Sequence, residues 1–63
     1  MDIGKKIKEF REEKNLNIKQ LAEKVECTPS LISQLERGKA DPSISMLKRI
    51  AEALNVNIVD FFM

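Results

Sequence analysis

Two short amphipathic segments, separated by a tight turn, constrain the fold of this chain more than any other feature of its sequence. The first runs from Ile18 to Val25 and the second from Pro29 to Arg37. Apolar residues recur in both at the three- and four-residue steps of a helix with one buried face. Because the connection is so short, the two helices must pack against each other at an angle.

Capping residues indicate where these two helices begin and end. Asn17 is a favoured N-cap, and Gln20 three positions later completes a pattern like a capping box. Thr28 followed by Pro29 predicts an N-cap and a first helical residue, where the missing N–H of proline costs nothing. Gly38 is placed to end the second helix in the left-handed backbone conformation.

The residues before this pair predict one further helix. Ile3, Ile7 and Phe10 recur at helical spacing, so they share one face of a helix that we expect to run to about Lys14. Asp2 is placed to cap it.

Two more helices are predicted after the pair. Beyond the loop signal at 41–42, Ser43 or Ser45 can cap a helix that ends at Asn55 and carries Leu47, Ile50, Ala51 and Leu54. Asn57 and Asp60 predict a final one-turn helix. The chain is therefore expected to be all-α, with five helices and no strand.

Size and composition narrow the function. A chain of 63 residues has room for one core, so we expect residues 1–63 to form a single domain. It contains no His and one Cys, which leaves no internal disulfide, no ordinary zinc site and no Cys-His or Ser-His pair for catalysis. No apolar run predicts a secretion signal or a membrane span. We therefore expect a cytoplasmic protein that is not an enzyme and needs no metal or cofactor.

The charge pattern bears on the choice of partner. The net charge is +1, so the chain lacks the overall positive field with which many proteins attract nucleic acid. The charges are unevenly distributed: Lys5, Lys6 and Lys8 crowd one end of the first helix, and Arg37 and Lys39 flank Gly38. Any attraction to phosphate must come from local patches.

The stretches LNIKQLAEKV (16–25) and TPSLISQLERGK (28–39) closely resemble the phage repressor/Cro-like, or Xre-type, helix-turn-helix family. The resemblance extends from Ile3 through Phe62. It implies a compact five-helix domain in which helices two and three form the helix-turn-helix. It also implies a regulator of transcription that binds double-stranded DNA, commonly as a homodimer on a palindromic operator, with the third helix in the major groove.

Within the third helix, Ser30, Ser33, Gln34 and Arg37 follow helical spacing and lie opposite the apolar positions. Gln34 can pair with both hydrogen-bonding groups of adenine. The residues expected to contact bases, by their positions in the motif, are Thr28, Pro29, Ser30, Ser33 and Gln34.

The resemblance also assigns contacts to the DNA backbone. Asn17 and the N–H groups that begin the second helix match the phosphate clamp of the family. Basic residues could add charge, which gives four expected backbone contacts: Asn17, Lys19, Arg37 and Lys39. Two residues depart from the family pattern. Glu26 stands where glycine is common, and Ile18 replaces a glutamine that commonly contacts phosphate.

Three further features have more than one interpretation. Arg11 and Glu36 match a family pair that ties the first helix to the third, and the pair is either buried or exposed. Cys27 is either a small core residue or a redox sensor. For the apolar segment 61–63 we expect one aromatic ring in the core and the rest in a dimer contact, in monomer packing or against a longer chain. The rival hypothesis for the whole chain is a protein-interaction module that keeps the fold without binding DNA.

Overall fold

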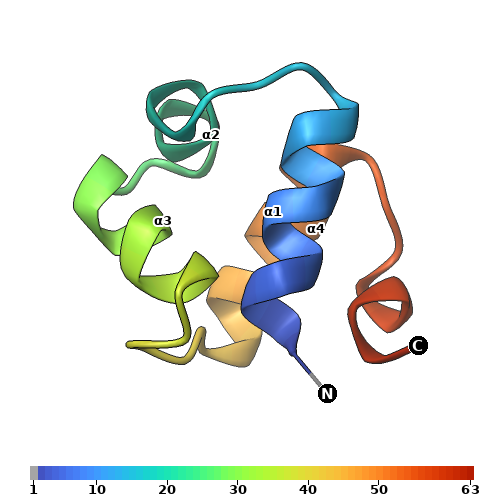
Figure 1. The fold of residues 1–63 in the computed structure, drawn as a ribbon. Helices are drawn as coiled ribbons and strands as arrows, with labels where there is room; N and C mark the ends of the chain where they lie inside the picture. The colour runs from blue at the N-terminus through green and yellow to red at the C-terminus, as the bar shows by residue number, and fades with distance from the viewer. Residues whose placement is uncertain (1) are drawn as a thin grey trace.

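The computed structural model describes residues 2–63, which form four α-helices and a terminal 3-10 helix (Figure 1). The elements are α1 (Ile3–Glu13), α2 (Ile18–Val25), α3 (Pro29–Glu36), α4 (Ile44–Leu54) and η1 (Ile58–Phe62). No strand occurs within this part of the chain. The all-α prediction is therefore confirmed, and α2 has the predicted bounds.

The predicted final one-turn helix is present as a 3-10 helix, so four α-helices and a 3-10 turn stand where five helices were expected. The N–H of Asp60 donates to the carbonyl of Asn57 at 2.9 Å, the three-residue step of a 3-10 turn. The Asp60 carboxylate in turn accepts from the N–H of Asn57 at 3.1 Å. Both bonds join residues three positions apart, whereas the backbone hydrogen bonds of an α-helix join residues four positions apart. Elsewhere α1 and α3 end one residue earlier than predicted, with Lys14 and Arg37 as their C-caps.

Each of the four α-helices begins with a side-chain cap. An oxygen of the N-cap residue accepts a hydrogen bond from the backbone N–H three positions on, at distances between 2.7 and 3.1 Å. Such a bond satisfies one of the donors that a helix start leaves without a partner. The N-cap residues are Asp2, Asn17, Thr28 and Ser43.

The helices enclose one apolar core. In Figure 1, α1 crosses in front of α4, while α2 and α3 lie on one side of this pair and η1 on the other. Phe61 of η1 is fully buried, and its ring meets Phe10 of α1 edge to face at 5.4 Å between centroids. This confirms one core aromatic near the chain end. The core residues are Ile7, Leu21, Ala22, Val25, Ile32, Leu35, Leu47, Ile50, Ala51, Leu54 and Phe61.

Glu26, the C-cap of α2, adopts a left-handed backbone conformation with φ of 59°. A residue with a Cβ is strained there, and glycine is not. The Glu26 carboxylate forms an exposed ion pair with Arg49 at 3.5 Å, which contributes about 0 to 1 kcal/mol. Gly38, by contrast, ends α3 at φ of 75°, as predicted. The turn between α2 and α3 therefore keeps a left-handed geometry without a glycine to relieve it.

We expect Glu26→Gly to raise the free energy of unfolding by about 0.5 to 1 kcal/mol, because relief of the left-handed strain exceeds the extra chain entropy of glycine. Urea denaturation followed by circular dichroism measures this change. Glu26→Ala is the matched control, since it removes the same ion pair and keeps the strain. Equal stabilities for the two variants would contradict the strain at this position.

Candidate nucleic-acid interface

One side of α3 is buried and the other faces outward. Ile32 is fully buried and Leu35 is 2% exposed, so these two side chains fix which face of the helix meets the core. Ala22 of α2 is also buried, and its small side chain permits α2 and α3 to approach closely. Of the residues expected to contact bases, Ser33 is half-buried and four are exposed: Thr28, Pro29, Ser30 and Gln34.

The polar side chains on the outward face of α3 differ in how many of their hydrogen-bonding groups are still available to a partner. The Thr28 hydroxyl accepts from the N–H of Leu31 at 3.1 Å, so its oxygen already serves as the helix cap. The Gln34 amide donates to the Ser30 hydroxyl at 3.5 Å, a long and therefore weak bond. The amide oxygen of Gln34 and its second N–H remain available. These are the acceptor and donor that the major-groove edge of adenine requires.

The start of α2 provides the second part of the surface. Asn17 and Gln20 form a reciprocal capping box with bonds of 2.7 and 2.8 Å. The N–H groups of Ile18 and Lys19 have no acceptor within residues 2–63. The Lys19 side chain is exposed, whereas Ile18 is half-buried against the core. A helix start with open N–H groups and a nearby lysine suits a phosphate, and the Ile18 side chain takes no part in it.

Basic residues follow the C-terminal end of α3. Arg37 and Lys39 are both exposed, and neither forms an ion pair with any residue of the segment 2–63. Gly38 between them turns the chain away from the helix axis. Exposed basic groups therefore lie at the end of α3, although the chain as a whole is nearly neutral.

Arg11 and Glu36 form a buried ion pair between α1 and the last residue of α3. Arg11 Nε lies 2.7 Å from Glu36 Oε2, Nη2 lies 3.1 Å from Oε1, and Nη1 donates to the Leu16 carbonyl at 2.8 Å. The two side chains are 9% and 5% exposed, so the interpretation as an exposed pair is wrong. The hydrogen bond to Glu36 raises the pKa of the Arg11 guanidinium above its ordinary value, against an opposing effect of burial. The guanidinium of Arg11 is charged at every physiological pH.

Cys27 lies in the turn between α2 and α3 and is half-buried. Its Sγ donates to the Thr28 carbonyl at 3.6 Å. Burial raises the pKa of the thiol, an effect that the nearby Arg49 opposes. A raised pKa means less reactive thiolate, so the environment favours the structural interpretation over the redox sensor.

Comparison with known proteins identifies the class of this domain. A family model described as Helix-turn-helix matches residues 7–61. The chain belongs to this helix-turn-helix family. The immunity repressor protein of Bacillus phage phi105 is 38% identical over 58 residues, covering 92% of this chain and 40% of the repressor. Multiprotein-bridging factor 1 of Debaryomyces hansenii is also 38% identical over 58 residues, covering 92% of this chain and 39% of that protein.

Solved structures give the same result for the fold. The biofilm regulator SinR, in complex with DNA, superposes on this helix-turn-helix domain with a TM-score of 0.91 at 34% identity. The match covers 97% of this chain and 98% of the SinR chain. The domain therefore matches that SinR chain over its whole length, whereas it spans about two fifths of the two sequence relatives above. No helix formed by residues 2–63 is long and apolar enough to cross a membrane.

One residue that packs against α3 has no counterpart in the predictions from the sequence. Gly4 lies in the first turn of α1, where it is buried against the last turn of α3. A glycine inside a helix costs about 1 kcal/mol relative to alanine. Its position in an otherwise regular amphipathic segment is the signal from which a close backbone contact could have been predicted.

We expect Glu36→Gln to lower the free energy of unfolding by roughly 3 to 5 kcal/mol, because it leaves the buried Arg11 charge without its partner. Denaturant unfolding measures the loss. Glu26→Gln is the matched control, since it breaks the exposed pair with Arg49 and should cost less than about 1 kcal/mol. A double-mutant cycle that finds no coupling between Arg11 and Glu36 would contradict a structural role for the pair.

Proposed function

We propose that this domain binds double-stranded DNA in a sequence-specific manner, as the DNA-binding part of a transcriptional regulator, with α3 in the major groove. The carrying observation is that α3 presents a polar face which no other part of residues 2–63 covers. An α-helix fits the major groove of B-DNA, where each base pair displays a distinct set of donors and acceptors. The DNA complex of the similar SinR domain supports this proposal.

The proposed roles follow the position of each side chain. Base contacts come from the exposed side chains at the start of α3 and from those that follow along its outward face: Thr28, Pro29, Ser30, Ser33 and Gln34. Phosphate contacts come from the start of α2 and the end of α3: Asn17, Lys19, Arg37 and Lys39. The first set distinguishes sequences, and the second holds the domain on any duplex.

The small net charge is compatible with DNA binding because the acidic charge of α3 is buried and the basic charges at its end are exposed. Glu36 is the only acidic residue of α3, and Arg11 neutralises it inside the protein. The basic groups of Arg37 and Lys39 remain exposed. A phosphate near the end of α3 therefore meets positive charge.

The domain is proposed to act as a homodimer in the cytoplasm, without enzymatic activity. Two copies related by a twofold axis can place two α3 helices in successive major grooves, about 34 to 36 Å apart. Phe62 and Met63 are 42% and 78% exposed, and such apolar side chains are candidates for contacts between the copies.

A second candidate function is a protein-interaction module with the same fold. Two observations favour it. Ile18 replaces the glutamine that commonly contacts phosphate in the family, and the net charge is only +1. The similarity to multiprotein-bridging factor 1 is a third. This alternative predicts no preference among DNA sequences.

Selection of bound duplexes from a random DNA library distinguishes the two functions. A DNA-binding domain should return a palindrome with half-sites one helical turn apart, and its affinity should fall steeply as salt rises. An interaction module should return no consensus sequence. Failure to enrich any sequence at low salt would overturn the proposed function.

We expect Lys39→Ala and Ser33→Ala to affect binding in different ways. Loss of the lysine should weaken specific and non-specific binding alike and reduce the salt slope by about 0.9, the effect of one phosphate contact. Loss of the serine hydroxyl should instead change the ratio of affinities between operator variants. Fluorescence anisotropy with selected and scrambled duplexes measures both. Equal losses on all sequences for both variants would contradict the role of Ser33 in base recognition.

A further inference from the structure

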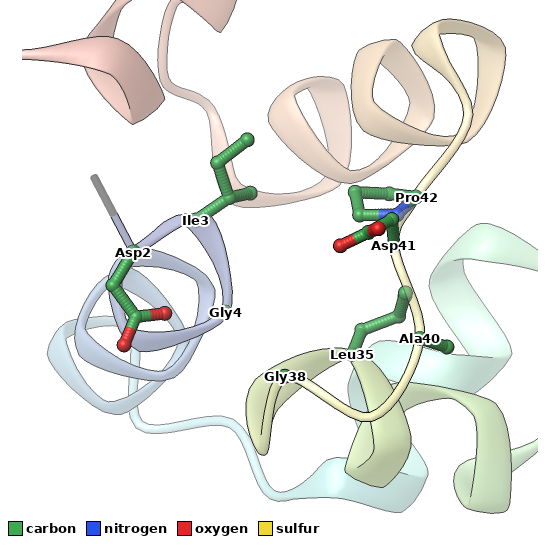
Figure 2. A pocket seen from close by; sticks show the side chains of 8 residues that line it. All are labelled: Asp2, Ile3, Gly4, Leu35, Gly38, Ala40, Asp41 and Pro42. Carbon is green, nitrogen blue, oxygen red and sulfur yellow. The ribbon is translucent and has the colours of Figure 1, made fainter.

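The first turn of α1 lies directly against the last turn of α3 (Figure 2). Gly4 is buried at this contact. A Cβ atom at this position would overlap the carbonyl oxygen of Leu35, and it would lie 2.9 Å from the carbonyl oxygen of Glu36. The two backbones therefore approach more closely than any side chain at Gly4 would permit.

The atoms that a side chain would meet at Gly4 belong to the backbone of α3. A flexible side chain could rotate to make room, but a helical carbonyl moves only when its helix moves. Any larger residue at Gly4 must therefore displace α1 and α3 relative to each other.

The same face of α1 contacts α3 a second time. Gly4 and Arg11 are seven residues apart, so they lie two turns apart on one side of the helix. Gly4 meets the backbone of Glu36, and Arg11 binds its carboxylate at 2.7 Å. Because two contacts on α1 converge on one residue, the end of α3 is fixed both in position and in rotation.

The displacement should fall on α3 rather than on α1. α1 also packs against α4 and η1, through the fully buried Ile7 and the Phe10–Phe61 contact. α3 is only eight residues long and packs chiefly against α1 and α2. A shift of the backbone at Leu35 would also move Ser33 and Gln34, because they belong to the same helix and lie within two residues of Leu35. Both are among the residues proposed to contact bases.

We propose that Gly4 is a positioning residue for DNA recognition: its missing side chain sets the placement of α3 and hence the alignment of the base-contacting groups. This inference rests on the proposed function, because it concerns the discrimination between DNA sequences. Gly4 itself is buried behind α3 and is assigned no contact with DNA.

Gly4→Ala tests the proposal, with discrimination rather than stability as the readout. Alanine favours the helix more than glycine does, so its effect on stability combines a gain with the cost of the overlap. The measured quantity is the ratio of affinities for the selected operator and for a scrambled duplex. We expect this ratio to fall about tenfold or more, the order of one lost base contact.

Two further proteins make the test specific. Gly4→Ala is also made in the Glu26→Gly background, which is expected to be more stable, so that a marginal variant stays folded. Val56→Ala is the matched control, because this half-buried residue lies in the link between α4 and η1, and its loss should lower stability without moving α3. We expect Val56→Ala to keep the affinity ratio of the unmodified chain while both Gly4→Ala proteins lose it.

The outcomes separate this proposal from the proposed function. If the unmodified chain selects no DNA sequence, the proposed function fails first. If it selects an operator and folded Gly4→Ala discriminates equally well, Gly4 is not a positioning residue. A Gly4→Ala chain that is unfolded in both backgrounds would also overturn the inference, since Gly4 would then be required by the fold as a whole. Amide chemical-shift changes concentrated at 33–38 would support it.

Discussion

The burial of Ile32 and Leu35 is the interaction on which the rest of the structure depends. These two side chains take the inner face of an eight-residue helix, and such a helix would not be stable alone in water. Their burial determines how α3 is rotated about its own axis. The outward position of Ser30, Ser33 and Gln34 follows directly, because residues on opposite faces of a helix cannot move independently.

Two neighbouring helices, α1 and α2, hold α3 in different ways. α2 provides close apolar packing at Ala22, while α1 provides a backbone contact at Gly4 and a charged one at Arg11. The apolar packing is tolerant of small changes, whereas the backbone contact and the ion pair require defined geometry. The location of the two strict contacts at the end of α3 explains why so short a helix can hold its side chains in register.

Most of the helical architecture could be predicted from the sequence, because its signals are local. Asn17, Thr28 and Ser43 cap their helices through bonds that span three residues, and Gly38 ends α3 by its own backbone preference. The 3-10 form of η1 was not predicted, since a single turn carries little periodic information. The contact at Gly4 was missed for another reason. It joins residues more than thirty positions apart, and a glycine in a helical pattern indicates a close contact without identifying the partner.

The candidate site likewise has a part that could be predicted from the sequence and a part that could not. The outward stripe of α3 follows from helical spacing, and the buried state of the Arg11–Glu36 pair required the tertiary structure. The side chains of Ser30 and Gln34 contribute little to the stability of the fold, because both are exposed and the hydrogen bond between them is long. Substitutions at those positions should therefore be nearly neutral for folding. Sequence preference in such a scaffold can diverge between duplicated copies while the framework stays unchanged, which is how one architecture can supply many regulators with separate targets.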